Sequence, residues 1–546
     1  MNIRLILFLC IFITISCKND KSENDLTENQ LQTNSTDTVE EMEFKVVDSR
    51  FIDNEELWAP FQSDLSEFTG EVYEEVKALV FEKSIPQIQQ SIDEGKLTYE
   101  ELALFYLSRI KEYDRDNELS LNSVIALNPD LLKEARQKDE LKSKVANHHL
   151  IFGIPVLLKD NINTAAMPTT AGAAALQDND TQDAFIVERL KENGAIILGK
   201  ANLSEWAYFF CGECPSGYSA VGGQTLNPYG RKIHDTGGSS SGSGVAVAAN
   251  LAPVAVGSET SGSILSPSSQ NSVVGLKPTV GLLSRGGVVP ISSTLDTPGP
   301  MTRSVIDNAI LLSAMTGVDQ KDPASKAAGK KENNFYSDLK QTDLKGKRFG
   351  AIKSLMEDTL YLRAVNDLRN AGAEIVEYEA EEINLPNFIR LLNLDMKKDL
   401  PEYFKNYGGE PRFQNVQDVV DYNSEDSLGR APYGQALFLG IIKDSASTEE
   451  FTAIKDTLMR NGTRFFEKPM KEYKLDAVLS INNYHAGFAA VAKYPAITVP
   501  MGYNSQNAPK GLTFIGKPFT EQQLLQWAYT FEQTTNRRKT PENYNE

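Results

Sequence analysis

Two short apolar segments with an amphipathic helix between them constrain the fold of this chain most. The first, residues 152–158, contains no charged side chain and is followed directly by Lys159. Residues 184–193 have the spacing of an amphipathic helix, and residues 195–198 form the second apolar segment. A strand, a helix and a strand in that order predict an α/β domain with a largely parallel, buried sheet. Active-site groups of such domains gather at the carboxyl ends of strands, where Lys159 is expected.

Two clusters of glycine and serine, in residues 235–244 and 257–263, flank an apolar run at residues 245–256. The run is rich in alanine and valine and is too long for a turn, so it predicts a buried helix that leads into a short strand. A flexible linker has a similar composition, but linkers are not flanked by buried apolar runs. We therefore expect the two clusters to form loops at opposite ends of this unit, facing one site.

The other patterns extend the same domain along the chain. Residues 70–115 predict helices, one of which begins with a capping box at Thr98 and Glu101. No linker rich in proline, glycine or serine divides residues 70–546, so one large domain is expected. Further strands are expected at 346–352, 373–376, 475–479 and 496–500, strands with tight turns at 275–301, and helices at 128–144, 305–315, 521–534 and through most of 385–470.

The amino terminus has the pattern of an exported protein. Arg4 is followed by an almost unbroken apolar run of 11 residues, Leu5–Ile15. That run is too short to cross a bilayer, which takes about 20 residues. Ser16 then precedes Cys17, as in the lipobox of bacterial lipoproteins, although Thr14 stands in place of the usual leucine. A plain secretory signal is the alternative.

These patterns divide the chain into a lipoprotein signal peptide at residues 1–16, a disordered acidic tether at 17–45 and a folded domain at 46–546. Acylation of Cys17 would anchor the exported protein to a bacterial membrane, in the periplasm or at the cell surface. The formal net charge of −19 argues against binding of nucleic acid through a basic surface.

Two cysteines, Cys211 and Cys214, lie in the predicted domain. A zinc site would need more ligands, and the four histidines are not spaced to supply them, so no metal is expected. A local disulfide and a pair of free thiols both stay open.

Glycine-serine loops beside a strand-end lysine indicate nucleophilic catalysis. Serine needs a base to take its proton, and glycines let backbone N–H groups converge on a developing oxyanion. Residues 257–264 offer several amides in a tight turn that ends near Ser263. Lysine is mostly charged at neutral pH, so Lys159 must be desolvated to act as a base. A carboxylate at Asp160 would raise the pKa of Lys159 if it pointed inward. The positive charge of Lys200 would lower that pKa if it lay close.

Two other chemistries fit the sequence less well. A phosphate-binding loop needs a lysine in its motif, and Ser241–Gly244 has none. A Ser-His-Asp triad needs a histidine, and neither His234 nor His485 lies in a supporting motif.

Several long motifs, in order along the chain, resemble the amidase signature family. The resemblance covers roughly residues 80–540, and residues 394–404 and 418–423 are similar to its peptide-amidase-like branch. It implies the amidase signature fold, an α/β fold in which helices cover both faces of a large, mixed, mostly parallel sheet in a single domain. The motifs are GIPVLLKDNI, KANLSEWA, GGQTLNPYG, TGGSSSGSGVAVAANL, GSETSGSI, GLKPTVGLLSRGG, LDTPGPMTRSV and YPAITVPMG.

The resemblance also implies a catalytic set that works without metal or cofactor. Ser263 would attack the amide carbon, Ser239 would relay the proton and neutral Lys159 would be the base. Ser239 would follow a cis peptide bond. The oxyanion hole would be made of consecutive backbone N–H groups, those of Thr260, Ser261, Gly262 and Ser263.

The loop before the nucleophile departs from the family's pattern. Many members have an aspartate and two glycines there, whereas this chain has Glu259, Thr260, Ser261 and Gly262. Leu265 replaces an arginine found in many members. The change from glycine to Ser261 is compatible with the loop only where φ is negative or a positive value is tolerated.

The implied activity is hydrolysis of a carboxylic amide, in a small molecule or a peptide such as a C-terminally amidated peptide, through an acyl-serine intermediate. Two alternatives stay open. One is a glutaminase like the A subunit of glutamyl-tRNA amidotransferase, against which an export signal weighs. The other is a non-catalytic surface lipoprotein that binds amides or peptides.

Overall fold

The computed structural model describes residues 41–115, 117–144, 148–329, 334–339 and 343–545. The signal peptide and most of the tether, including Cys17, lie outside the described residues. Chain contacts group residues 42–546 into one unit.

An eleven-stranded sheet forms the centre of this unit, in the order β1-β3-β2-β6-β8-β7-β12-β13-β11-β9-β10. Strands β4 and β5 form a separate small hairpin. The strands are β1 Val124–Leu127, β2 Pro155–Lys159, β3 Ile196–Ala201, β4 Tyr218–Ser219, β5 Gly223–Gln224, β6 Val254–Glu259, β7 Val274–Lys277, β8 Thr297–Thr302, β9 Arg348–Ile352, β10 Glu374–Tyr378, β11 Ala477–Ile481, β12 Ala496–Tyr503 and β13 Pro509–Ile515.

The predicted large mixed sheet is confirmed, and its parallel pairs lie in two blocks. Strand β2 runs parallel to β3 and β6, and β9 runs parallel to β10 and β11. The six other neighbouring pairs are antiparallel, against four parallel ones. Parallel neighbours need a crossover segment, which α7 and α11 provide between β2 and β3 and between β9 and β10. The apolar patterns therefore revealed the crossover units, but not the antiparallel centre that joins them.

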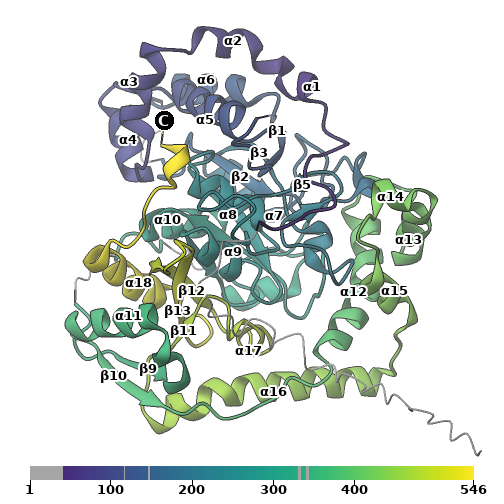
Figure 1. The fold of residues 1–546 in the computed structure, drawn as a ribbon, viewed down its shortest axis with the longest axis vertical. Helices are drawn as coiled ribbons and strands as arrows, with labels where there is room; N and C mark the ends of the chain where they lie inside the picture. Colours follow the sequence, from purple (N-terminus) through teal and green to yellow (C-terminus); the bar gives the residue numbers. More distant parts are fainter. Residues whose placement is uncertain (1–40, 116, 145–147, 330–333, 340–342, 546) are drawn as a thin grey trace, which may run out of the picture. The chain divides into compact units, whose positions relative to one another are not determined.

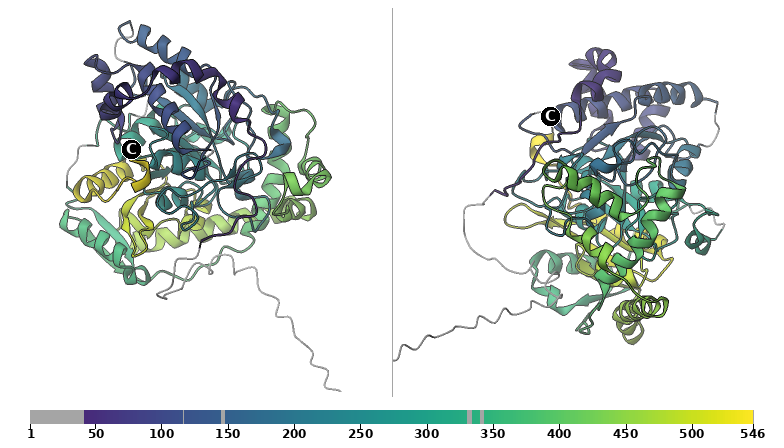
Figure 2. Two further views of the ribbon diagram at one scale, coloured as in Figure 1. Left: turned by 45° about the horizontal axis from the view of Figure 1, so that its top comes forward. Right: turned by 90° about the vertical axis from the view of Figure 1, so that its right-hand side faces the viewer.

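Helices surround the sheet from one end to the other. Helices α3 to α6 lie near the β1 end, and α11 lies beside β9 and β10 at the opposite end (Figures 1 and 2). The helices are α1 Asn54–Trp58, α2 Gln62–Glu67, α3 Glu71–Val80, α4 Ile85–Asp93, α5 Tyr99–Tyr113, α6 Leu131–Leu141, α7 Phe185–Glu192, α8 Ser241–Ala248, α9 Leu265–Gln270, α10 Val305–Met315, α11 Thr359–Asn370, α12 Phe388–Asn406, α13 Val416–Glu425, α14 Ser427–Arg430, α15 Ala436–Lys443, α16 Thr448–Glu472, α17 Ala486–Val491 and α18 Glu521–Thr535.

The predicted helix-to-strand unit between the two glycine-serine clusters is α8 followed by β6. Every residue of both elements is buried. Gly242 allows this close packing, because a Cβ atom there would clash with the carbonyl oxygens of Ser123 and Asn202. The capping box of Thr98 and Glu101 begins α5, as expected.

Residues 385–470 are mainly helical, as predicted, and supply α12 to α16. Their apolar side chains form a second core with Trp206, Phe209 and Phe210. Among the described helices, none combines the length and the apolar character needed to cross a membrane.

Candidate active site

Three strands bring the predicted site residues to one edge of the sheet. Because β2 and β6 are parallel neighbours, Lys159 and Ser258 lie at the same end of their strands. Strand β8 runs antiparallel to β6 and pairs Thr297 with Glu259, so Asp296 enters at that end too. We call this end of the three strands the lysine edge.

Lys159 is fully buried at the end of β2, where its Nζ atom has three hydrogen-bond partners. It donates to Ser239 Oγ at 2.8 Å, to Ser258 Oγ at 2.9 Å and to the Ser258 carbonyl oxygen at 3.1 Å. A neutral amine has two N–H groups and one lone pair. It can therefore keep both bonds to Ser258 while accepting the Ser239 proton, because a hydroxyl both donates and accepts.

Burial lowers the pKa of Lys159 from its ordinary value of 10.5 to about 7. Asp296 and Glu259 raise this pKa by charge attraction, but the loss of hydration is the larger effect. A substantial fraction of Lys159 is consequently neutral at neutral pH, as a general base requires.

Asp160 and Lys200, the two charged residues expected to affect Lys159, pair with each other instead. Asp160 is buried and forms an ion pair with Lys200 at 3.2 Å. It also accepts hydrogen bonds from the side chain and backbone of Thr170. Neither Asp160 nor Lys200 is a hydrogen-bond partner of Lys159, whose surroundings are shaped by Asp296 and Glu259 instead.

The two glycine-serine loops meet through their backbones. The peptide bond between Gly238 and Ser239 is cis, as the resemblance implied. The next N–H, that of Ser240, donates to the carbonyl oxygen of Ser263 at 3.2 Å. Ser240 Oγ also donates to the Ser258 carbonyl oxygen at 3.1 Å. The loop of Ser239 is thus joined to both ends of the loop that carries Ser263.

Ser263 follows the tight turn after β6 and keeps 9% of its surface exposed. In this turn Gly262 has a φ of +91°. Ser261 has no positive φ, so a side chain is tolerated there, which accounts for the departure from glycine at this position.

Acidic side chains hold this turn in place on both sides. Thr260 Oγ1 donates to Asp296 Oδ1 at 2.6 Å. Glu259 Oε2 accepts from the backbone N–H groups of Ile264 at 2.8 Å and Leu265 at 3.0 Å. The turn that carries Thr260, Ser261, Gly262 and Ser263 is therefore fixed before a ligand arrives.

Three residues that were not predicted from the sequence complete the site. Ser258 binds Lys159, Asn161 donates to Ser258 Oγ at 2.9 Å, and Asp296 holds Thr260. All three lie inside the family motifs given above, and this position in a motif was the only sequence feature that pointed to a role in the site. Their contacts join strands far apart in the sequence, so spacing could not reveal them.

The two candidate histidines bond to other groups. His234 Nε2 lies 3.1 Å from the carbonyl oxygen of Gln506, and His485 Nδ1 lies 2.6 Å from Ser480 Oγ. Burial lowers the pKa of His485 to about 4. Among the described residues, Lys159 is the basic side chain that bonds Ser239.

Two neighbouring cavities adjoin the lysine edge. The inner one, of about 10 Å³, is lined by Asn161, Ser258, Thr260 and Asp296, among others. The outer one, of about 650 Å³, shares Asp296 and Arg285 with it and extends toward the end of α12. A cavity of that size suits a small organic ligand or a few residues of a peptide.

Cys211 and Cys214 form a disulfide, which resolves the choice left open by the sequence. No group of three histidine, cysteine, aspartate or glutamate side chains among the described residues is arranged to hold a metal ion.

Known proteins resemble this chain over most of its length. The family model described as Amidase matches residues 101–481. A probable amidase of Arabidopsis thaliana is 40% identical over 84% of this chain and 91% of its own. The A subunit of glutamyl-tRNA(Gln) amidotransferase from Acinetobacter baumannii is 32% identical over 83% of this chain and 96% of its own.

Among solved structures, native peptide amidase from Stenotrophomonas maltophilia is 38% identical, with a TM-score of 0.80, and the match covers 85% of this chain and 99% of that one. The match of the family model to more than half of the chain and the shared fold lead to one conclusion: the chain belongs to the amidase family, whose members hydrolyse amides.

Proposed function

We propose that this amidase acts through an acyl-Ser263 intermediate, with Ser239 as the proton relay and Lys159 as the base. One observation carries the proposal: the buried amine of Lys159, with a pKa of about 7, lies 2.8 Å from Ser239 Oγ. The backbone bond between Ser240 and Ser263 supports a relay beside the nucleophile.

In the acylation step, Ser263 Oγ attacks the carbonyl carbon of the amide. Its proton passes to Ser239 Oγ while the Ser239 proton passes to the Lys159 lone pair. The C–N bond then breaks, and the proton returns along the same path to the leaving nitrogen. A water molecule repeats the sequence on the acyl-serine, which releases the carboxylic acid and restores Ser263.

The negative charge that develops on the carbonyl oxygen needs fixed hydrogen-bond donors. The backbone N–H groups of Thr260, Ser261, Gly262 and Ser263 are the candidates, because their turn is held by Glu259 and Asp296. Donors held in position before the reaction need no reorganisation, and removing one such donor typically slows an enzyme by about 10²–10³-fold.

We propose C-terminally amidated peptides as the substrate class. The similarity to a peptide amidase of the same fold supports this choice, and the outer cavity has room for the last residues of a peptide. A glutaminase remains the second candidate, because the amidotransferase relative is similar over 83% of the chain.

A panel of amides tests the substrate class. The purified protein is incubated with short peptide amides, simple acyl amides and glutamine, and ammonia release is measured. Peptide amides are expected to react with the highest kcat/KM. Glutamine as the best substrate would favour the second candidate, and no release from any amide would favour a binding protein.

Two variants test the base in the same assay. Lys159→Ala is expected to lose almost all activity, because no other base bonds Ser239 among the described residues. His234→Ala is expected to retain it, since His234 bonds Gln506 instead. The reverse result would transfer the role of base to histidine.

We also propose that the protein is exported and anchored through an acylated Cys17. The lipobox-like pattern before Cys17 supports this proposal.

A further inference from the structure

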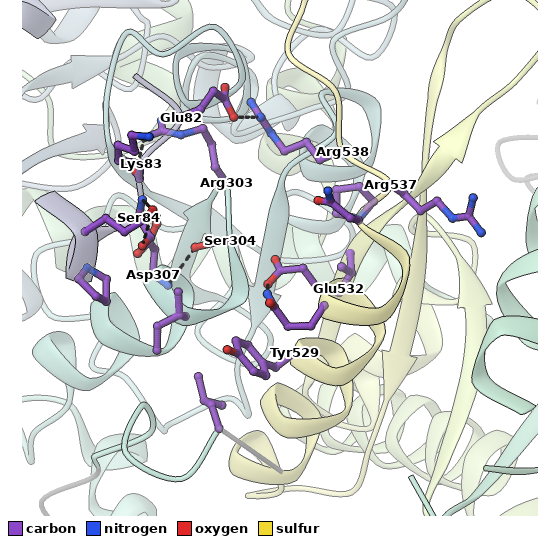
Figure 3. Close-up of a pocket in the computed structure, with 18 of the residues that line it drawn as sticks. Glu82, Lys83, Ser84, Arg303, Ser304, Asp307, Tyr529, Glu532, Arg537 and Arg538 are labelled. Atoms are coloured by element: carbon purple, nitrogen blue, oxygen red, sulfur yellow. Dashed lines mark hydrogen bonds and ion pairs between the residues drawn. The ribbon is translucent and has the colours of Figure 1, made fainter. Parts of the chain in front are cut away.

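A second large cavity lies at the opposite end of the strands from the lysine edge. Its volume is about 620 Å³, and the connection from α3 to α4, the start of α10 and the end of α18 border it (Figure 3). Arg303 follows Thr302, which pairs with Val254 at the start of β6, whereas Glu259 ends β6. Strands rise by about 3.3 Å per residue, so roughly 17 Å separates the two ends. The cavity is therefore distinct from the candidate active site.

Some of the charged side chains around this cavity already have partners. Arg538 forms an ion pair with Glu82, and Arg537 forms one with Asp367 at 2.7 Å. These two ion pairs neutralise the charges of Arg537 and Arg538.

Two cations of the wall, Lys83 and Arg303, have no such partner. Neither forms an ion pair within 4.0 Å with a described residue. Arg303 is buried, with 7% of its surface exposed, and donates through Nη1 to the carbonyl oxygen of Ala252 at 2.8 Å. Its Nε atom has no hydrogen-bond partner among the described residues. We call Lys83 and Arg303 the cationic pair.

Two carboxyl groups of the wall, Asp307 on α10 and Glu532 on α18, also lack an ion pair to a described residue (Figure 3). Asp307 accepts from the N–H of Ile85 at 2.7 Å, and Glu532 from the N–H of Val305 at 2.8 Å. A carboxylate has room for about four hydrogen bonds, so both can accept more. We call Asp307 and Glu532 the carboxyl pair.

Neighbouring groups only partly offset the cost of burying the two carboxyl groups. Burial raises the pKa of Asp307 to about 6 and that of Glu532 to about 7. The charge of Arg303 lowers the pKa of Asp307, and the charge of Arg538 lowers that of Glu532, but burial is the larger effect on both. No ion pair within 4.0 Å joins the cationic pair to the carboxyl pair among the described residues. A ligand with both charges could therefore compensate the two pairs at once.

Part of the remaining wall is apolar and can contact a hydrocarbon side chain. Its apolar residues come from α10, α18, β12 and the segment before β9, and include Ile306, Leu339, Val499 and Tyr529.

We propose that this cavity binds a small zwitterion, a free amino acid or a short peptide with unblocked ends. The carboxylate of the ligand pairs with the cationic pair, and its ammonium group pairs with the carboxyl pair. An apolar ligand side chain contacts the apolar wall. An extended dipeptide spans about 7 Å, which suits groups that lie too far apart for direct ion pairs.

Calorimetric titration of the full-length Ser263→Ala protein with L-leucyl-L-leucine tests the proposal without any need for turnover. Saturable binding of one equivalent is expected. The N-acetylated dipeptide loses its ammonium group and should bind roughly tenfold more weakly or worse. Absence of dipeptide binding, or equal binding of the N-acetylated dipeptide, would overturn the proposal.

Two conservative variants in the same background locate the site. Lys83→Gln and Glu532→Gln remove one charge from each pair and should each weaken dipeptide binding by roughly tenfold. Lys96→Gln is the matched control, because Lys96 lies outside the cavity and pairs with Glu94. Thermal unfolding checks that every variant is folded. Unchanged binding in both cavity variants would assign the dipeptide to another site and refute the proposal, whatever the outcome for catalysis.

Discussion

At the scale of single residues, Lys159 depends on a balance between burial and two carboxylates. Burial lowers its pKa, whereas Asp296 and Glu259 raise it, and the result is about 7. The fraction of neutral Lys159 therefore grows as the pH rises through 7. We expect kcat/KM to rise with pH along an acid limb centred near 7, as measured by initial rates of ammonia release. A limb centred near 10, the ordinary range of lysine, would contradict this environment.

Asp296→Asn should shift that limb to lower pH. The substitution removes a negative charge that raises the pKa of Lys159, so the amine loses its proton more readily. It also replaces with an amide the carboxylate that accepts hydrogen bonds from the N–H groups of Ile291 and Ser292 and from Thr260 Oγ1. The turn at Thr260 should therefore loosen, and kcat should fall. The pH profile of kcat/KM separates the two effects. A limb that moves to higher pH would show that Asp296 does not act on Lys159 by its charge.

Substitution should lower kcat at one residue of the turn, Gly262, and leave it nearly unchanged at its neighbour Ser261. Gly262→Ala places a side chain at a φ of +91° with its Cβ 3.0 Å from Asn483 Nδ2. The left-handed conformation alone costs about 1–2 kcal/mol, so kcat should fall by roughly tenfold or more. Ser261→Gly removes a side chain that is not needed for this conformation and should change kcat by less than about threefold. Equal effects of the two changes would disprove this view of the turn.

At the scale of elements, the sequence predicts best those helices and strands that are buried along their whole length or along one face. The unit of α8 and β6, the strand that ends at Lys159 and the closing helix α18 follow from apolar patterns, because each element buries its whole length or one face. The antiparallel pairing of β8 with β6 and β7 was not predictable, since residues 297–302 contain two prolines and a glycine. Asp296 could not be predicted as a residue of the site, because its position depends on the pairing of β8.

The packing of α8 gives a test at this scale. Gly242→Ala should destabilise the protein by about 1–3 kcal/mol, because the added methyl group would clash with backbone atoms of Ser123 and Asn202. Gly440→Ala in α15 has only Asn393 Nδ2 nearby, at 3.9 Å. It should stabilise the protein by about 0.5–1 kcal/mol through the better helix propensity of alanine. Urea unfolding midpoints measure both, and a stabilised Gly242→Ala variant would refute the close approach.

At the scale of the whole molecule, the two ends of the central strands differ in chemistry. The lysine edge carries the paired loops and the two neighbouring cavities, whereas the opposite end carries the cationic and carboxyl pairs. Chain length and composition did not reveal this division, because both ends are assembled from segments that are distant in the sequence.

The proposed anchor gives a prediction for the complete chain. Cys17→Ala removes the site of acylation, so the variant should move from the detergent-rich to the aqueous phase in phase partitioning of bacterial extracts. Its amidase activity should be unchanged, because residues 46–546 form the predicted catalytic domain. Continued partitioning into detergent would exclude lipidation at Cys17.

The activity of Ser263→Ala is the sharpest test of whether Ser263 is the nucleophile. Ammonia release from a peptide amide that the native enzyme hydrolyses is compared for the native enzyme, Ser263→Ala and the nearby control Ser266→Ala, all checked for folding by circular dichroism. We expect kcat to fall by roughly 10³-fold or more in Ser263→Ala, because the nucleophile is gone, and to stay close to native in the control. Native activity in Ser263→Ala would contradict an acyl-Ser263 mechanism.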